Sequence, residues 1–316
     1  MRGDLVTVFG GSGFIGRYVV RRLAHAGWQV RVAVRRPDQA LFLKTAGHVG
    51  QVTPVAANIR NEASVRAAVS GASAVINLVG ILFQSGPQRF DAVHAEGAAR
   101  VSAAAAAAGA QALVHVSAIG ADPQSASGYA RSKAAGEAAV RKAFPTATII
   151  RPSIVFGPED GFFNRFAKMA LLSPALPLIG GGTTRFQPVY VLDVAEAIAR
   201  AVEDPQACAG KTFELGGPRI YSFRELLTLM LAEIGRKRML VSLPFPIASL
   251  QGALLQSVPF IRPPLTADQV KLLKRDNVVG PQAMGFKELG LTPTAVEPIL
   301  PTYLDRYRPH GYYSRA

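Results

Sequence analysis

A glycine-rich turn near the start of the chain constrains its fold more than any other feature. The apolar run Leu5–Phe9 is typical of a short buried strand, and it leads directly into GGSGFIG at residues 10–16. These glycines fit both G-x-G-x-x-G and G-x-x-G-x-x-G spacing, which allows a tight turn, close approach of a pyrophosphate and close helix packing. The following helix would present free N–H groups to the phosphates. The residues predicted to hold a dinucleotide here are Gly10, Ser12, Gly13, Phe14, Ile15 and Gly16.

Short apolar runs and helix-like segments alternate through the first half of the chain. The runs are apolar on both faces, as strands buried in a parallel sheet are. The predicted strands are Leu5–Phe9, Gln29–Val34, Gln51–Ala56, Ala74–Val79, Leu113–Ser117 and Thr146–Ile150, with helices near 14–26, 38–46, 61–70, 91–108 and 128–143. This α/β order predicts a doubly wound parallel Rossmann sheet.

Proline and glycine become frequent after Arg151-Pro152, and the strand–helix alternation loosens. This change predicts a smaller, irregular C-terminal α+β lobe. We assign residues 1–157 to the dinucleotide-binding domain, together with a returning segment near 187–217 in which Thr212–Leu215 adds a strand to the first sheet. Residues 158–186 and 218–316 are assigned to a lobe that docks a substrate or a partner.

Two arginines follow the second predicted strand, where an NAD site usually carries an acidic residue for the ribose hydroxyls. Arg35 and Arg36 can instead pair with a 2′-phosphate. NADPH is therefore the predicted cofactor, and NAD is less favoured. Asn58 is placed to reach the adenine, and Val79 and Gly80, at the end of the fourth strand, to pass backbone along the cofactor.

A serine, a tyrosine and a lysine form the candidate catalytic group. Ser117 ends the fifth predicted strand, and Tyr129 and Lys133 open the next helix four residues apart, on one face. A lysine ammonium beside a tyrosine favours the tyrosinate and lowers its pKa, which suits a general acid/base. Ser117 would orient a carbonyl or alcohol oxygen. Whether this group turns over a substrate is a separate question.

The chain is strongly basic, with 35 Lys and Arg against 21 Asp and Glu and a formal net charge of +14. Half of the excess lies in residues 1–60, and a further +5 lies in residues 236–276. This balance indicates anionic partners. The second cluster surrounds the uncharged stretch Leu240–Phe260, which is broken by prolines and suits buried core, a membrane interface or a partner surface better than a membrane span.

Other classes of protein are disfavoured by what the sequence lacks. A single cysteine, Cys208, rules out a disulfide framework, and no His/Asp/Glu cluster has metal-ligand spacing, so no metal is predicted. His94 and His115 are expected to pack or hydrogen-bond. No helix-turn-helix signal or stacking platform supports nucleic-acid binding.

These motifs together resemble the short-chain dehydrogenase/reductase superfamily in its extended or atypical branch, which includes NAD-dependent epimerases and dehydratases. The resemblance rests on GGSGFIG, Ser117, YARSK at 129–133, RPSIVFGP at 151–158 and FELGG at 213–217. In that superfamily the Arg-Pro stretch passes the nicotinamide, which implies contacts from Pro152 and Ile154.

A closer resemblance is to the nucleotide-binding accessory subunit of respiratory complex I, NADH:ubiquinone oxidoreductase. It covers most of residues 5–300, and the blocks PEDGFFNRFA and QPVYVLDVA are its most specific parts. It implies tightly held NADPH, no established turnover, and docking against other complex I subunits at the quinone-side junction. It implies a peripheral place on the cytoplasmic side of a bacterial inner membrane, or on the matrix side for a processed organellar form. The basic cluster in residues 236–276 adds the expectation of contact with an anionic membrane or an acidic protein surface.

Two alternatives remain open from the sequence. One is a working NADPH-dependent reductase or epimerase that uses Ser117, Tyr129 and Lys133 on a carbonyl or nucleotide-sugar substrate. The other is a regulator that senses the NADP(H) ratio through a partner.

Overall fold

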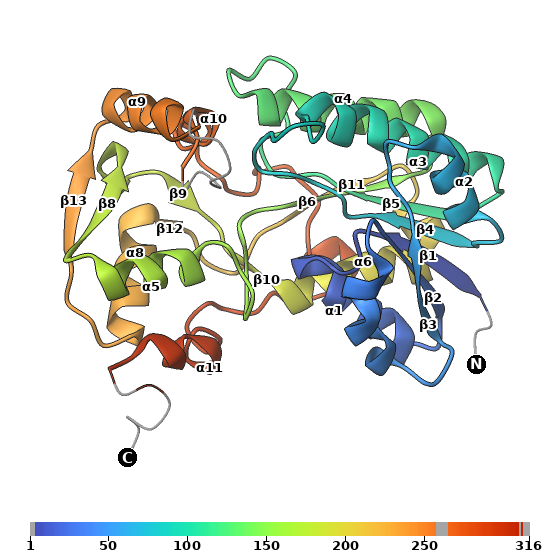
Figure 1. The fold of residues 1–316 in the computed structure, drawn as a ribbon, viewed down its shortest axis with the longest axis horizontal. Coiled ribbons are helices and arrows are strands. Elements are labelled where there is room, and N and C mark those ends of the chain that lie inside the picture. The colour runs from blue at the N-terminus through green and yellow to red at the C-terminus, as the bar shows by residue number, and fades with distance from the viewer. Residues whose placement is uncertain (1–3, 257–264, 310, 312–316) are drawn as a thin grey trace. The chain divides into compact units, whose positions relative to one another are not determined.

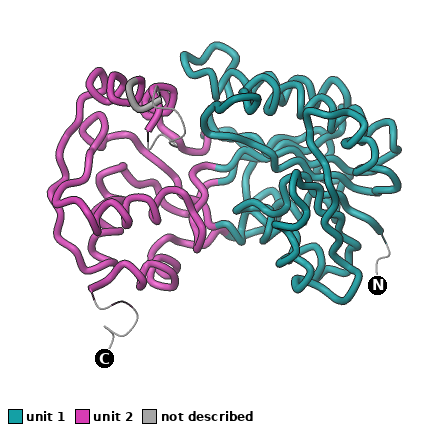
Figure 2. Tube along the Cα trace, viewed as in Figure 1, with its two compact units in different colours: residues 1–152, 191–215, 281–292 teal, residues 153–190, 216–280, 293–316 magenta. Residues whose placement is uncertain are grey.

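A computed structural model describes residues 4–256, 265–309 and 311, and the chain divides into two compact units. Unit 1 comprises residues 1–152, 191–215 and 281–292, and unit 2 comprises residues 153–190, 216–280 and 293–316 (Figure 2). The segment 281–292, which the sequence analysis assigned to the smaller lobe, lies in unit 1. The reason is a backbone pairing, because the Glu214 N–H donates to the Met284 carbonyl at 2.8 Å.

Unit 1 is built on a seven-stranded, all-parallel sheet. The strands in spatial order are β11 (Thr212–Leu215), β6 (Thr148–Pro152), β5 (Ala112–Val116), β4 (Ala74–Asn77), β1 (Leu5–Phe9), β2 (Gln29–Val34) and β3 (Val52–Ala56). The strand order reverses between β1 and β4, and ligands of such sheets bind at the carboxyl ends of the strands at this switch point. The predicted Rossmann sheet is confirmed, as is the returning strand Thr212–Leu215.

Helices cover both faces of this sheet (Figure 1). One face carries α2 (Glu62–Val69), α3 (Glu96–Ala107) and α4 (Gly128–Ala143), and the other carries α1 (Phe14–His25) and α6 (Val191–Glu203). Shorter elements are η1 (Pro37–Ala46), η2 (Asp91–Ala95), α7 (Pro205–Cys208) and η4 (Lys287–Leu289). Two predicted helices differ in type: η1 is a 3₁₀ helix, and the first turn of the segment 91–108 is π-helical.

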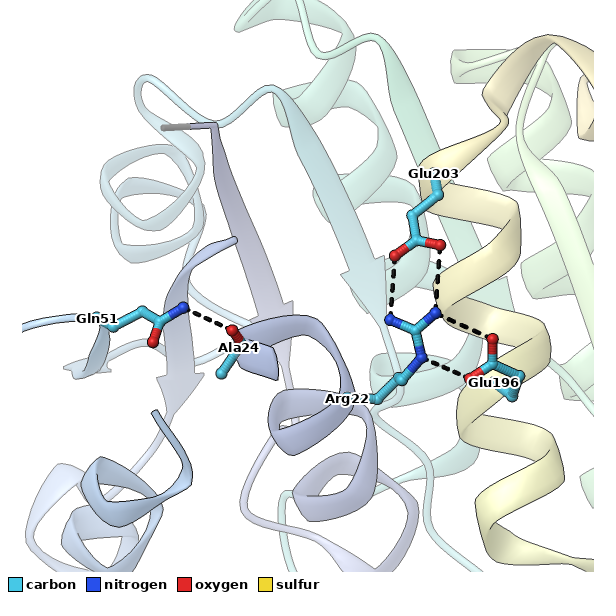
Figure 3. A network of polar contacts seen from close by, with 5 residues as sticks. All are labelled: Arg22, Ala24, Gln51, Glu196 and Glu203. Carbon is cyan, nitrogen blue, oxygen red and sulfur yellow. Dashed lines mark hydrogen bonds and ion pairs between the residues drawn. The ribbon is translucent and has the colours of Figure 1, made fainter. Parts of the chain in front are cut away.

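Helix α1 is held in place by two polar contacts (Figure 3). Arg22 on α1 forms paired ion pairs with Glu196 and Glu203, which lie two turns apart on α6, at 3.0 and 3.1 Å. Gln51 donates to the Ala24 carbonyl near the carboxyl end of α1 at 2.7 Å. Because charge-assisted, bidentate contacts are strong and directional, they fix the helix whose first turn follows the glycine turn.

Unit 2 combines three two-stranded sheets with helices around an aromatic core. Its sheets pair β7 (Val155–Phe156) with β10 (Val189–Tyr190), β9 (Arg185–Phe186) with β12 (Tyr221–Ser222), and β8 (Ala175–Ile179) with β13 (Met239–Leu243). Its helices are α5 (Phe163–Leu172), η3 (Gly180–Gly182), α8 (Phe223–Glu233), α9 (Phe245–Gln256), α10 (Ala267–Leu272), α11 (Pro301–Leu304) and η5 (Asp305–Tyr307). Within the described ranges, no helix has the length and apolar content needed to cross a bilayer.

In unit 2, the block PEDGFFNRFA contains a buried carboxylate, Asp160, that accepts four hydrogen bonds. The Asp160 carboxylate accepts from the N–H groups of Gly157, Phe162 and Asn164 at 3.0–3.2 Å and from the Tyr303 hydroxyl at 2.6 Å. A buried carboxylate needs such donors, because an unpaired one is costly. The hydrogen bond from Tyr303 to Asp160 therefore links α11 to the loop before α5, and this contact gives the block PEDGFFNRFA a structural role.

Candidate dinucleotide-binding site

The glycine turn connects β1 to α1 at the switch point of the sheet. Gly10 has a φ of +79°, a left-handed conformation that favours glycine, and its N–H donates to Ala33 on β2 at 3.1 Å. A Cβ on Gly16 would lie 2.4 Å from the Gly10 carbonyl oxygen and 2.6 Å from the Gly11 Cα. A Cβ on Gly11 would lie 2.9 Å from Val32. The turn is therefore compact because its glycines pack backbone against backbone.

The first turn of α1 has the arrangement that anion binding needs. Its N-cap is Gly13, whose missing side chain caps no N–H, and no acidic residue lies in the first turn. The first N–H groups of a helix have no partner within the helix and carry a partial positive charge. Gly13 is exposed, and Ser12, Phe14 and Ile15 are half-buried, so the turn is open to a ligand.

Arg35 and Arg36 follow β2 beside this turn. The β1–β2 register pairs Phe9 with Ala33, so the residues after Val34 continue next to Gly10. Both arginines are exposed, and neither guanidinium has an ion pair or hydrogen bond to another residue of the described chain. This leaves both charges available to a phosphate, and their assignment to a 2′-phosphate stays a prediction.

Asn58 lies beyond β3, two strands from β1, and serves its own loop. Its side-chain oxygen accepts from the Arg60 N–H at 3.1 Å, and its backbone exchanges hydrogen bonds with Ser64. The side chain is half-buried, and a contact with adenine stays a prediction.

The loop after β4 brings the glycine turn and the lysine together. A Cβ on Gly10 would lie 3.3 Å from Val79, and one on Gly80 would lie 3.4 Å from Lys133 Nζ. Val79 itself is held by its N–H, which donates to the Asn77 side chain at 3.1 Å. The structure therefore places Val79 and Gly80 between the two halves of the predicted site.

Ser117, Tyr129 and Lys133 gather where β5 ends and α4 begins. Lys133 Nζ donates to the carbonyl of Val116 at 3.1 Å and lies 6.0 Å from the centre of the Tyr129 ring. The Ser117 hydroxyl is buried and has no hydrogen-bond partner in the described part of the chain. A buried hydroxyl without a partner marks a place where a ligand or a water completes the site.

Burial changes the titration of this group in a direction that the sequence did not predict. The pKa of Tyr129 is raised to about 12, because desolvation disfavours the tyrosinate. Burial also lowers the pKa of Lys133 to about 8, although the nearby charge of Glu137 opposes this shift. The expected lowering of the tyrosine pKa by the lysine is wrong for the structure, because burial of the hydroxyl raises it.

Sequence reasoning missed the ionic support behind Lys133. Glu137 forms a bidentate ion pair with Arg151 at 2.7 and 2.9 Å, and Arg151 also contacts Glu214 at 3.3 Å. The signal was present, because Tyr129, Lys133 and Glu137 recur every four residues and therefore share one helix face. Arg151 lies on β6, and no pattern in the sequence indicated that it would pair with Glu137.

The Arg-Pro stretch leaves the sheet at Pro152. Pro152 is buried at the end of β6, and its carbonyl accepts from the Ile119 N–H at 3.1 Å. Ile154 belongs to unit 2, where its N–H donates to Asn277 at 3.1 Å. Their contacts with a nicotinamide stay a prediction. Among the residues that the structure describes, no three His, Cys, Asp or Glu side chains lie close enough to hold a metal ion.

A glycine turn at a switch point, followed by a Ser, Tyr and Lys group where β5 ends and α4 begins, defines a class of dinucleotide-dependent proteins. The chain belongs to the NAD-dependent epimerase/dehydratase family, whose model matches residues 6–216. This confirms the superfamily resemblance predicted from the motifs.

Two similar relatives carry names that describe different functions. The chain is 40% identical to the mitochondrial NADH dehydrogenase [ubiquinone] 1 alpha subcomplex subunit 9 of Arabidopsis thaliana, over 98% of this chain and 79% of the relative. It is 32% identical to a ceramide reductase of Caulobacter vibrioides, over 80% of this chain and 78% of the relative. Among solved structures, dTDP-glucose 4,6-dehydratase from Streptomyces venezuelae shares the fold, with a TM-score of 0.72, 20% identity and 96% of each chain covered.

Proposed function

We propose that this protein is an accessory subunit of respiratory complex I that binds NADP(H) without turning it over. The observation that carries the proposal is the similarity to the plant complex I subunit along nearly the whole chain. The geometry supports nucleotide binding, because the first turn of α1 is uncapped and open to a phosphate. The absence of turnover is part of the proposal and is tested by NADPH oxidation assays.

Affinity purification of a complex I core subunit from solubilised membranes tests this proposal. We expect the chain to copurify in a fixed ratio to the core subunits and to carry a nucleotide that mass analysis identifies as NADPH. Its consistent absence from an active, intact complex would contradict the assignment, whatever nucleotide the free chain binds.

NADPH is proposed over NADH because of the two free arginines beside the glycine turn. Replacing both Arg35 and Arg36 with Ala is expected to weaken NADPH binding by about 30-fold, since each would lose a charge-assisted contact. NADH binding should change by less than about threefold, and calorimetric titration measures both. Equal loss for the two nucleotides would place the arginines away from the 2′-phosphate.

A second candidate is a working NADPH-dependent reductase, favoured by the similarity to the ceramide reductase. Tyr129 would then protonate the substrate oxygen, and Lys133 would hold the cofactor ribose. Oxidation of NADPH by the purified protein with a long-chain carbonyl substrate, lost in Tyr129→Phe, would support this reading. If the purified protein oxidises no NADPH with such substrates, the reductase reading is contradicted and the accessory-subunit proposal stands.

We further propose a peripheral position on the cytoplasmic side of a bacterial inner membrane, or on the matrix side in an organelle. The surface that supports it belongs to unit 2. Helix α9 carries no charged residue. It buries small residues, Ala248 and Gly252, and exposes Ile247 and Leu250, the latter by 63%. A Cβ on Gly252 would lie 2.7 Å from the Ala267 N, so the small face packs tightly against α10.

Strand β13 directly precedes α9 in the chain (Figure 1) and also exposes apolar side chains. Met239 and Val241 are 64% and 51% exposed. The exposed cations Lys237, Lys271 and Lys274 lie in the segments next to this surface, and Lys274 Nζ is 5.7 Å from the Phe245 ring. Apolar side chains bordered by lysines suit the interface of an anionic bilayer. The predicted stretch 240–260 is thus partly exposed, and its residues 257–260 lie outside the described chain.

Replacing Lys271 and Lys274 with Gln is expected to weaken binding to phosphatidylglycerol vesicles by about 30-fold, since each lysine near such a surface contributes about 1 kcal/mol. Flotation of the full chain with vesicles measures this. Lys142 and Lys287, exposed in unit 1, provide the matched control pair when changed to Gln. Binding that is equal to phosphatidylcholine vesicles, or equally weakened by the control pair, would contradict the membrane contact and favour a protein partner.

A further inference from the structure

The buried imidazole of His94 connects the loop after β4 to the helix that carries Tyr129 and Lys133. His94 lies in the π-helical turn η2, a type of turn that is frequent at functional sites. A Cβ on Gly136 of α4 would lie 2.2 Å from the His94 carbonyl oxygen. The π turn and α4 therefore approach backbone to backbone, and this approach brings the imidazole in among the side chains of α4.

Both ring nitrogens of His94 have a hydrogen-bond partner, and only one tautomer fits both bonds. The Ile81 N–H donates to His94 Nε2 at 3.0 Å, so the ring proton must lie on Nδ1. His94 Nδ1 lies 2.8 Å from the Ser132 hydroxyl, which donates to the Tyr129 carbonyl at 2.7 Å. The chain of bonds from Ile81 to Tyr129 is satisfied at each step only by a neutral imidazole with this tautomer.

The surroundings keep the imidazole neutral and in place. Burial, with the nearby charge of Lys133, lowers the pKa of His94 to about 3. The ring stacks on Phe90 at 5.5 Å and meets the edge of Tyr129 at 5.4 Å. His94 thus contacts Tyr129 through its ring as well as through Ser132.

Ile81 follows Gly80 directly, and Gly80 is the residue whose added Cβ would lie 3.4 Å from Lys133 Nζ and 3.7 Å from His94 Nε2. The loop after β4 has no regular structure between Leu78 and Phe90 apart from a bridge of Ser85 with Gln88. The bond from Ile81 to His94 therefore sets how far this loop stands from Lys133.

We propose that His94 is a positioning residue for dinucleotide binding, which holds the Gly80–Ile81 backbone and Tyr129 at a fixed separation. This inference rests on the proposed binding of NADP(H) at the glycine turn. His94 acts through the loop and the helix and needs no contact with the nucleotide itself. Its role would not show as a motif, because the sequence offers only a single histidine in a helical segment.

Two variants separate the hydrogen bonds of His94 from its shape. His94→Phe keeps an aromatic ring against Phe90 and Tyr129 but loses both hydrogen bonds. His94→Gln restores an acceptor that reaches the Ile81 N–H. We expect NADPH to bind about tenfold more weakly to the Phe variant, because it loses the hydrogen bond that holds the Ile81 N–H, and within about threefold of wild type to the Gln variant, which keeps that bond. Calorimetric titration of the full chain measures both.

A spectroscopic measurement makes the test independent of affinity. In protein with ¹⁵N-labelled histidine, His94 should show a protonated Nδ1 and an unprotonated Nε2 at neutral pH, with and without NADPH. A charged ring or a proton on Nε2 would overturn the inference, and so would wild-type affinity in the Phe variant. Failure of the wild-type protein to bind NADPH would instead overturn the proposed function. The tautomer would still show whether His94 accepts the hydrogen bond from Ile81.

Discussion

Gly16→Ala is expected to abolish stable dinucleotide retention, with a fall in NADPH affinity of about 100-fold or more. The new methyl group would lie 2.4 Å from the Gly10 carbonyl oxygen and 2.6 Å from the Gly11 Cα. Both are backbone atoms of the turn, so α1 must move away from it rather than a side chain giving way. The same overpacking should cost about 3 kcal/mol of unfolding free energy.

Gly161→Ala is the matched control, because a Cβ at Gly161 meets nothing within 4 Å. Calorimetric titration with NADPH and urea denaturation of both variants measure the two effects. Retention of NADPH by Gly16→Ala at wild-type affinity would show that the turn tolerates displacement and that the phosphates lie elsewhere.

Lys133→Met is expected to stabilise the protein in the absence of nucleotide while lowering NADPH affinity by about 100-fold. Burial lowers the Lys133 pKa from 10.5 to about 8, so the folded state disfavours the ammonium. Between pH 8 and 10.5 the unfolded chain binds more protons than the folded one, and stability from this group rises with pH. Below pH 8 the full cost, up to about 3 kcal/mol, is present and methionine removes it.

The Val116 carbonyl would lose its donor, which offsets about 1 kcal/mol of this gain. Denaturation midpoints at pH 7 and pH 9.5 measure the balance, and the gain should shrink at the higher pH. Lys142→Met, at an exposed position of the same helix, serves as the control. A lower denaturation midpoint for Lys133→Met than for wild type at pH 7 would contradict this prediction. It would show that contacts besides the Glu137 charge stabilise the ammonium in the folded protein.

The candidate site lowers the stability of the free protein at Lys133, where it would serve a ligand. The glycine turn has no side chains that could cap the first N–H groups of α1, and Lys133 is buried although burial disfavours its ammonium. A bound nucleotide would supply oxygen acceptors to both. Sites that stabilise a ligand are often less than optimal for the stability of the free protein.

The sequence by itself determined the class of fold and one end of the site. Short apolar runs that alternate with helical segments indicate strands of one parallel sheet, so β1 to β6 and the returning β11 followed from local pattern. The positions of β3 and β11 at the two edges of the sheet did not. The glycine turn was also local, because its backbone requirements are met by four glycines within the seven residues 10–16. Arg35 and Arg36 followed from their position after β2.

Tertiary structure alone decided the properties that depend on residues distant in the chain. Tyr129 and Lys133 are adjacent on a helix face, but their pKa values depend on what covers that face, and burial reverses the expected effect on Tyr129. His94 reaches the side chains of α4 only because Gly136 lets η2 and α4 approach each other closely. Desolvation and long-range hydrogen bonding have no periodicity along the chain, and this is why sequence patterns located the candidate residues without determining their chemistry.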